Sequence, residues 1–318
     1  MKNCWKELLL SVMLAWVVPW VVMAAAKVKF PEKQEPQITQ TQPTQPQKTQ
    51  SQSVPMIELW KDGKLEHIPM DTYLTGVLLS EMPGSFHMEA KKAQAVVART
   101  YTLRRMGGSG KHPGAVCADS RCCQGYLDPE TFADQNAAAL ARQAVEETVD
   151  MVLTYDGELI DATYFSCSGG MTEDAVAVWG SDVPYLQSVE SPGEEIAAHY
   201  TDTVFIAKSK LESVLGTKLS GEKYVSAVTY TEGGGVASVM IGGHTYRGTE
   251  LRSLLGLRST AFEMQVTAEG ITFITKGYGH RVGMSQYGAQ AMALQGSTFG
   301  QILAHYYQGT ELIRWTAK

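Results

Sequence analysis

The residue with the clearest chemical potential is Glu81, in the stretch "YLTGVLLSEMPGSF" that covers residues 73–86. Three aliphatic residues precede it at the three- and four-residue spacings of one helical face: Leu74, Val77 and Leu78. A carboxyl group held among apolar side chains has a raised pKa, because desolvation penalises its charged form. Such a group suits general acid catalysis; the alternative is a half-exposed structural glutamate at a helix end.

Sequence signals place Glu81 at the end of a helix that follows a hairpin. Residues 56–70, "MIELWKDGKLEHIPM", alternate apolar and polar residues around Asp62-Gly63, a dipeptide that fits a tight turn. Asp71 is the expected N-cap of the following helix. A Pro-Gly pair shortly after Glu81 is expected to end that helix.

A second helix is expected directly afterwards. Residues 87–106, "HMEAKKAQAVVARTYTLRRM", contain neither Gly nor Pro. One helical stripe of this segment holds Ala90, Ala93, Val97 and Tyr101. Its small residues permit close packing against the helix of Glu81. Strand and helix signals are mixed in this way throughout 56–318, which predicts one α+β domain.

Three long motifs resemble those of one known family. They are "EMPGSFHMEAKKAQAVVARTY", "TYFSCSGGMTEDA" and "GYGHRVGMSQYGAQAMA". Together they resemble the family of stage II sporulation protein D, which includes the amidase-enhancer proteins. The resemblance covers essentially all of residues 56–318. It implies an α+β domain with a mixed sheet and helices around a glycan-binding groove, and it places the family's catalytic glutamate on Glu81.

The resemblance implies a lytic transglycosylase, which cuts peptidoglycan between N-acetylmuramic acid and N-acetylglucosamine and prefers strands without stem peptides. Ordinary glycoside hydrolysis uses two carboxyl groups. In the transglycosylase reaction the sugar's own C6 hydroxyl attacks, so one residue can first give a proton and then take one. The product carries a 1,6-anhydro end. Glu81 would therefore suffice, with Glu173 as an electrostatic aid.

The resemblance also implies which residues line the groove. In "YFSCSGG" it gives this role to Ser166 and Ser168, whose hydroxyl groups can bond to sugars. Cys167 stands where the family more usually has a hydroxyl residue. The two glycines that follow suit a loop whose backbone approaches a ligand closely.

Further groove residues are expected towards the C-terminus. Trp179 and Tyr185 offer flat surfaces for sugar rings, and Tyr185 matches a groove position of the family, although core packing is the alternative. The resemblance places His280 and Gln286 at the substrate. His280 could be a second proton carrier, but a structural histidine is favoured because Glu81 can perform both steps. Arg281 stands where family members commonly have Gly.

A loop rich in cysteine predicts a metal site. "KHPGAVCADSRCCQGY" (111–126) holds four soft ligands: His112, Cys117, Cys122 and Cys123. Three thiols and an imidazole are a complete donor set for a closed structural zinc site. Some family members have metal-binding Cys and His here, commonly two of each. A disulfide with one free cysteine is the alternative. Just beyond the loop, Gln124 is expected to face the glycan.

The N-terminal part is expected to export the domain. In residues 1–27, Lys2 and Lys6 come before a run of 19 uncharged residues (8–26), roughly the length that crosses a bilayer, and Lys27 closes it. A cleavable secretory signal also fits, but we favour an anchor. The expected location is the cell membrane, single-pass, with the catalytic domain on the cell-wall side. Residues 28–55, rich in Gln, Thr and Pro, predict a disordered linker.

Charge and resemblance define the expected partners. The chain has 27 Lys and Arg against 33 Asp and Glu, with no basic stripe, which argues against nucleic acid. The resemblance implies glycan strands, a sporulation amidase and a membrane assembly protein as partners. The main rival function is a non-catalytic glycan-binding activator of an amidase. A zinc hydrolase is disfavoured because four ligands leave the metal no open position.

Overall fold

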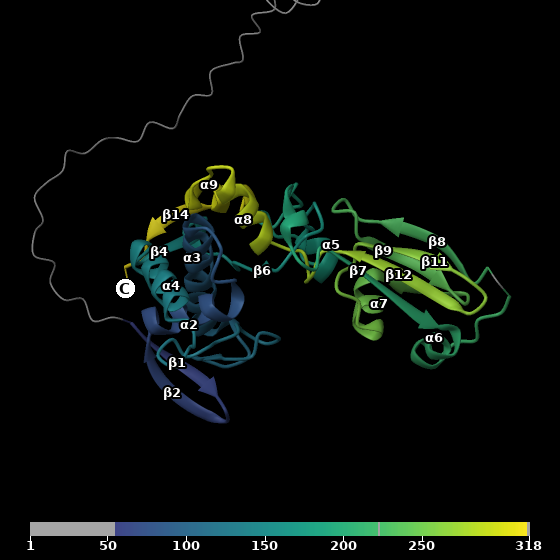
Figure 1. Cartoon of the computed structure of the whole chain (residues 1–318), viewed down its shortest axis with the longest axis horizontal. Helices are drawn as coiled ribbons and strands as arrows, with labels where there is room; N and C mark the ends of the chain where they lie inside the picture. Colours follow the sequence, from purple (N-terminus) through teal and green to yellow (C-terminus); the bar gives the residue numbers. More distant parts are fainter. Residues whose placement is uncertain (1–54, 222, 317–318) are drawn as a thin grey trace, which may run out of the picture. The chain divides into compact units, whose positions relative to one another are not determined.

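The computed structural model describes residues 55–221 and 223–316 (Figure 1). The expected anchor or signal, 1–27, lies outside these residues, as does all but the last residue of the expected linker, 28–55. Within the described ranges, every helix is too short or too polar to span a bilayer.

The described residues form a mixed α+β structure, as the sequence predicts. The helices are α2 (Met70–Glu81), α3 (Met88–Arg104), α4 (Gln135–Glu147), α5 (Ala175–Trp179), α6 (Lys208–Leu215), α7 (Gly248–Leu255), α8 (Gln286–Leu294) and α9 (Phe299–Tyr306), with the short helical turns η1 (Arg105–Ser109) and η2 (Glu194–Ile196). The strands are β1 (Met56–Lys61), β2 (Lys64–Pro69), β3 (Val116–Cys117), β4 (Met151–Tyr155), β5 (Glu158–Leu159), β6 (Tyr164–Phe165), β7 (Thr201–Ala207), β8 (Val225–Tyr230), β9 (Val236–Ile241), β10 (His244–Arg247), β11 (Phe262–Val266), β12 (Gly270–Lys276), β13 (Met284–Ser285) and β14 (Glu311–Arg314).

The strands are distributed over several small sheets, where the sequence predicted one mixed sheet. In the described part of the chain their orders are β2-β1-β3, β14-β4-β5, β13-β6, β11-β12-β7 and β10-β9-β8. Two pairs are parallel, β1 with β3 and β6 with β13. These two pairs matter most for the site, because each joins segments that are far apart in the sequence.

The predicted hairpin is confirmed, and one predicted helix cap is corrected. β1 and β2 pair in antiparallel fashion around Asp62 and Gly63, which have φ values of 50° and 75°. Two positive φ values are typical of the mirror-image turns that close hairpins. α2 begins at Met70, so Asp71 lies in its first turn and is not the N-cap. In the first turn its negative charge interacts favourably with the positive end of the helix dipole. No side chain caps the N-terminus of α2.

The predicted apolar stripes of α2 and α3 are both buried. Leu74, Val77 and Leu78 of α2 belong to one hydrophobic cluster, together with residues of β1 and α4. Three residues of the α3 stripe, Ala90, Ala93 and Val97, belong to a second cluster that also takes residues from α8 and α9. α3 therefore packs on one side against the cluster that contains α2 and β1, and on the other side against α8 and α9. This packing holds α2, which ends at Glu81, next to α3.

A third hydrophobic cluster lies entirely within residues 211–273. It is built from the strands β8 to β12 and from α6 and α7, which lie against these strands in Figure 1. The sequence interpretation treated 56–318 as one core, so this separate cluster was not anticipated. Its residues do not line the pocket that contains Glu81.

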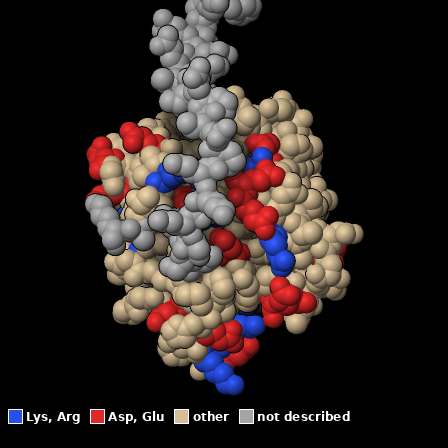
Figure 2. Space-filling view, turned by 90° about the vertical axis from the view of Figure 1, so that its left-hand side faces the viewer, with Lys and Arg blue, Asp and Glu red and all other residues tan. Residues whose placement is uncertain are grey.

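Charged side chains are mixed on the surface. On the face shown in Figure 2, the red Asp and Glu side chains cover more area than the blue Lys and Arg side chains, and the two kinds are interspersed. This visible face agrees with the formal net charge of -6 for the whole chain.

Candidate active site

Glu81 is the last residue of α2 and lines a pocket at the end of that helix. Burial raises the pKa of its carboxyl group, and this effect is larger than two opposing ones. One is the backbone N–H of Gly125, which donates a hydrogen bond of 2.8 Å to Oε1; the other is the side chain of Gln286. Met82 is already extended, so the chain leaves the helix immediately after the carboxylate.

The pocket has a volume of about 600 Å³, which is in the range of small-molecule and cofactor sites. Five of the predicted catalytic or groove residues line it: Glu81, Ser166, Trp179, His280 and Gln286. The parallel pairing of β6 with β13 brings Ser166 and Gln286 together, since it sets residues 164–165 beside residues 284–285. The sequence motifs thus converge on one cavity.

Gln286 begins α8 and is only 5% exposed. Its side chain lies close enough to Glu81 to lower the pKa of that carboxyl, yet its Nε2 has no hydrogen-bond partner of ordinary geometry among the described residues. A buried donor of this kind normally has a partner. At the pocket wall, a ligand oxygen can supply one.

Three predicted groove residues do not line the pocket. The hydroxyl of Ser168 is buried and donates a 2.8 Å hydrogen bond to Glu194. The hydroxyl of Tyr185 accepts a hydrogen bond from the backbone N–H of Asp161, and its ring packs on Tyr155. Gln124 is 1% exposed, with its carboxamide held by protein groups.

A physical reason explains the position of Ser168. Glu194 is a fully buried carboxylate, and such a charge is costly unless donors surround it. The backbone N–H groups of Ser168 and Gly169 also donate to its Oε2, each at 2.8 Å. The loop after Ser166 therefore turns inward, and a contact between the Ser168 hydroxyl and a sugar does not fit this geometry.

His280 lines the pocket as a neutral imidazole, which suits a structural role and hydrogen bonding. Burial, with help from the charge of Arg252, lowers its pKa to about 4, so the ring is neutral near pH 7. Its Nδ1 accepts a hydrogen bond from the N–H of Val282. The ring contacts Phe165 and Trp179, and Trp179 is 45% exposed at the pocket wall, where a sugar ring can pack.

Several pocket residues were missed by the sequence interpretation. Arg105, in the turn after α3, has its guanidinium over the ring of Tyr101 and 3.1 Å from the carboxylate of Asp161. Tyr164 contributes its ring from β6. The motif around Ser166 contains Tyr164, two residues earlier and hence on the same side of an extended chain. No sequence signal marks Arg105 or Asp161.

Glu173, expected to assist catalysis electrostatically, is not in the pocket. It is 1% exposed and forms an ion pair of 2.9 Å with Arg281, which is also buried. Arg281 has a φ of 69°, a left-handed conformation that favours glycine. This backbone geometry suits the glycine that the resemblance leads us to expect at this position.

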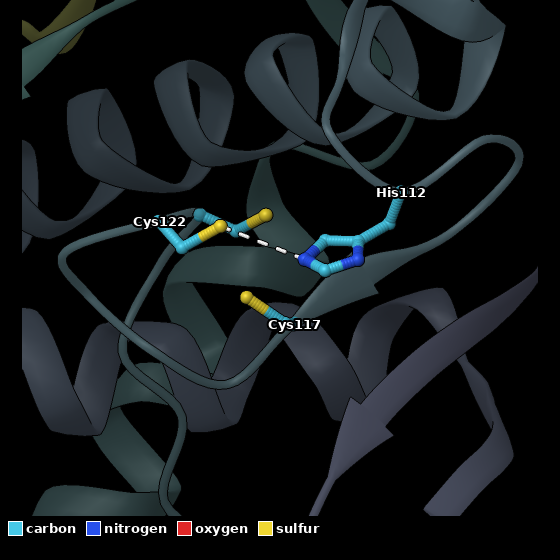
Figure 3. A group of neighbouring side chains, drawn as sticks. His112, Cys117 and Cys122 are labelled. Atoms are coloured by element: carbon cyan, nitrogen blue, oxygen red, sulfur yellow. Dashed lines mark hydrogen bonds between the residues drawn. The ribbon is translucent and has the colours of Figure 1, made fainter. Parts of the chain in front are cut away.

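The four predicted metal ligands form a compact cluster. Their nearest ligand atoms lie within 4.8 Å of one another: His112, Cys117, Cys122 and Cys123. Figure 3 shows the His112 ring facing the sulfur atoms of Cys117 and Cys122, with 3.5 Å between His112 Nε2 and Cys122 Sγ. β3 carries Cys117 and pairs with β1, which anchors one side of the loop.

The donor set of this cluster fits a tetrahedral zinc ion. All four described cysteines, these three and Cys167, are free thiols, so no disulfide joins any two of them. Burial raises the pKa of Cys123 to about 12, and burial also raises the pKa of Cys122. A dication held by the thiolates would offset this cost. Cys122 and Cys123 also line the pocket of Glu81.

Comparison with known proteins identifies the family of the chain. Residues 61–155 match the family model described as Stage II sporulation protein. The chain is 39% identical over 258 residues to stage II sporulation protein D of Bacillus subtilis (strain 168), covering 78% of this chain and 75% of the relative. To stage II sporulation protein D of Bacillus amyloliquefaciens it is 41% identical over 259 residues, with the same coverage.

A further relative is the amidase enhancer of Bacillus subtilis (strain 168), with 31% identity over 294 residues. That alignment covers 75% of this chain and 40% of the enhancer. Identities of 39% and 41% over 78% of this chain and 75% of each stage II sporulation protein D lead to one conclusion: the chain belongs to the family of stage II sporulation protein D.

Proposed function

We propose that the protein is a lytic transglycosylase that cleaves the bond between N-acetylmuramic acid and N-acetylglucosamine in peptidoglycan. One observation carries the proposal. The Glu81 carboxyl, with its raised pKa, lines a pocket of about 600 Å³ and has a fixed N–H donor at 2.8 Å. It can therefore hold a proton before the reaction and remain stable as a carboxylate after giving it away.

The proposed reaction uses this property twice. Protonated Glu81 first donates its proton to the glycosidic oxygen, so the bond to the leaving sugar breaks and positive charge develops at the muramic acid C1. The resulting carboxylate then takes the proton of the C6 hydroxyl as that oxygen bonds to C1. The product is a 1,6-anhydro end, and Glu81 is protonated again.

Asp161 is the other carboxylate at the pocket wall. A hydrolase would need it to activate water, with the two carboxyl groups flanking the scissile bond. Its Oδ1 instead lies 3.1 Å from Arg105, which satisfies its charge. The pairing supports a reaction with one catalytic carboxyl group, and the product ends distinguish the two chemistries.

Arg105 supports a preference for strands without stem peptides. Each muramic acid freed of its peptide carries a lactyl carboxylate, whereas an attached peptide converts this group into a neutral amide. Arg105 lines the pocket wall, and its Nε has no hydrogen-bond partner among the described residues, so the guanidinium has a donor left for a ligand carboxylate. Arg105→Gln should therefore slow cleavage of stripped strands more than cleavage of strands whose lactyl groups are amidated.

The experiment for the proposed function compares glycan products. The domain from residue 56 onward is incubated with stripped glycan strands, and the products are identified by mass spectrometry. We expect 1,6-anhydro ends with the native sequence and none with Glu81→Gln. Reducing ends would indicate a hydrolase.

The second candidate function is a non-catalytic glycan-binding activator of a peptidoglycan amidase. The relative named as an amidase enhancer favours it. In that case native protein and Glu81→Gln would bind strands equally, leave them uncut, and stimulate a partner amidase to the same extent. A zinc hydrolase is a weaker candidate, because all four ligands of the cluster are protein side chains.

We further propose that the cluster of His112, Cys117, Cys122 and Cys123 holds one structural zinc ion. The ion would tie the loop before Gln124 to β3. Because four protein ligands would fill its coordination sphere, the ion could not bind substrate or water, and the proton transfers would be carried out by Glu81. Zinc content of protein purified without chelator tests this assignment.

The cellular setting that fits this activity is sporulation, by analogy with the names of the relatives. We propose a single-pass membrane protein with its catalytic domain on the cell-wall side. Its partners would be an amidase that removes stem peptides and a membrane protein that assembles the complex. Expression timing and fractionation of cells would test these points.

A further inference from the structure

We propose that Gln124 and Gly125 form a positioning element for Glu81: the buried carboxamide of Gln124 fixes the following peptide, whose N–H orients the catalytic carboxyl group. The inference rests on the proposed role of Glu81 in proton transfer. It changes the role of Gln124, which the sequence interpretation assigned to glycan contact.

The first step is the anchoring of Gln124. Its Nε2 donates to the hydroxyl of Tyr73 at 3.2 Å and to the hydroxyl of Thr102 at 2.8 Å. Its Oε1 accepts a hydrogen bond of 3.1 Å from the hydroxyl of Tyr164. These partners belong to α2, α3 and β6. A buried carboxamide bonded at both ends has one orientation, so the backbone at 124 is held by three elements.

The second step is the close approach of Gly125 to α2. A Cβ atom at this position would lie 2.2 Å from Ser80 Oγ and 3.1 Å from Glu81 Oε1. Glycine lets the peptide come this near without displacing Ser80 or Glu81. Two residues later, the N–H of Leu127 donates to the carbonyl of Gly76 at 3.1 Å. The backbone of 125–127 is thus attached to α2 at two points one helical turn or more apart.

The third step is what the contact does. A backbone N–H directed at Oε1 cannot rotate away as a side-chain donor can, so it selects one orientation of the carboxyl group. It also bonds more strongly to the carboxylate than to the neutral acid. The contact therefore matters most after Glu81 has given up its proton and before it takes the next one. Ground-state glycan binding does not require it.

The test uses two readouts. The first is the Gly125 amide proton resonance in NMR spectra of the glycan-free domain from residue 56 onward, which shows whether the contact exists. We expect it downfield in the native protein and displaced in Glu81→Gln and in Gln124→Ala. Tyr164→Phe, a milder change, should displace it in the same direction by less. Thermal melts identify any variant that fails to fold.

The second readout is the split between kcat and KM. Gly125→Ala should lower kcat at least tenfold and leave KM within about twofold, since one fixed donor of this type contributes on that scale. Ser80 is exposed, so Ser80→Ala alone should behave as native protein. Added to Gly125→Ala, it removes the 2.2 Å contact and should restore part of kcat.

Two outcomes would overturn the inference. One is a folded Gln124→Ala variant whose Gly125 resonance and kcat are both unchanged. The other is a Gly125→Ala variant whose KM rises by the same factor as its kcat falls. If native protein cleaves no strands, the proposed function fails. The resonance still decides the positioning inference, because it is measured without substrate: displacement in Glu81→Gln and Gln124→Ala supports it, and a fixed resonance overturns it.

Discussion

Arg281 and Glu173 form a fully buried ion pair, with 2.9 Å between Nη1 and Oε1. The remaining donors of Arg281 are also used: Nε bonds to the carbonyl of Ser168, and Nη2 to those of Met171 and Gly233. Glu173 in turn accepts from the N–H of Gly235. The pair therefore joins the motif at 163–175, the C-terminal motif and the turn between β8 and β9.

Breaking this pair should destabilise the fold strongly. Arg281→Met leaves a buried carboxylate without its counter-charge, and we expect the free energy of unfolding to fall by about 3–5 kcal/mol. Removing both charges, in Glu173→Gln with Arg281→Met, should cost less than the sum of the single changes. Urea unfolding measures all three variants. The pair of Lys218 and Glu212 is the control, because the Lys218 side chain is exposed, and Lys218→Met should have a far smaller effect. Additive losses in the double variant would contradict the pairing.

This pair also shows where sequence reasoning stops. The resemblance leads us to expect glycine at position 281, which signals an unusual backbone, and the structure gives Arg281 a φ of 69°. Its partner is 108 residues away, and no spacing rule links the two. The place of Glu173 in a motif predicts an electrostatic aid to catalysis. Only the tertiary structure shows that its charge is used internally.

Loss of one cluster ligand should remove the metal and loosen the loop. Cys117→Ser is expected to lower zinc from about one ion per chain and to lower the melting temperature, because metal binding free energy contributes to folding. Cobalt-loaded native protein should show thiolate charge-transfer bands of a tetrahedral site. Cys167→Ser is the matched control, since Cys167 lies outside the cluster and donates to Glu194. Unchanged zinc content in Cys117→Ser, or a mapped disulfide at Cys117, would refute the site.

Replacement of Glu81 should stabilise the protein near neutral pH. The pKa of the folded-state carboxyl lies above its ordinary value of 4.5, so the folded state binds more protons than the unfolded state. Stability is therefore lost as pH rises from that ordinary value through the folded-state pKa. Glu81→Gln removes this cost, so it should be more stable than native protein at pH 7.5 and nearly equal to it at pH 4.5. Denaturant titrations at both values measure the difference; a less stable Glu81→Gln at pH 7.5 would contradict a buried, proton-holding carboxyl.

His280 should make the stability of the protein fall as pH falls below 6.5, the opposite of the trend expected from Glu81. Its folded-state pKa of about 4 lies below the ordinary 6.5, so the unfolded state binds more protons between these values. Its contribution to stability is complete above pH 6.5 and declines as pH falls towards 4. His280→Asn, which cannot be protonated in this range, should flatten the slope. Melting temperatures from pH 4 to pH 8 provide the measurement, and an unchanged slope would show that the ring is not held neutral.

Local patterns predicted the frame of the site well. The hairpin, α2 and α3 follow from turn residues and helical periodicity, and the apolar stripe led to Glu81. The cysteine cluster followed from residue types alone. Patterns failed where a side chain serves a distant partner. Ser168 stabilises Glu194, Gln124 anchors a peptide, and Tyr185 bonds to the backbone of Asp161; each is a polar residue in a motif, and its orientation depends on segments far away in the chain.

The most direct test of the central claim is the product analysis of Glu81→Gln beside native protein on stripped glycan strands. The amide keeps the shape of the carboxyl group and its ability to accept from Gly125, but it cannot give and reclaim a proton. The account predicts 1,6-anhydro ends from native protein, none from Glu81→Gln, and equal strand binding by both in a sedimentation assay. Anhydro ends produced by Glu81→Gln at more than a few per cent of the native rate would contradict it.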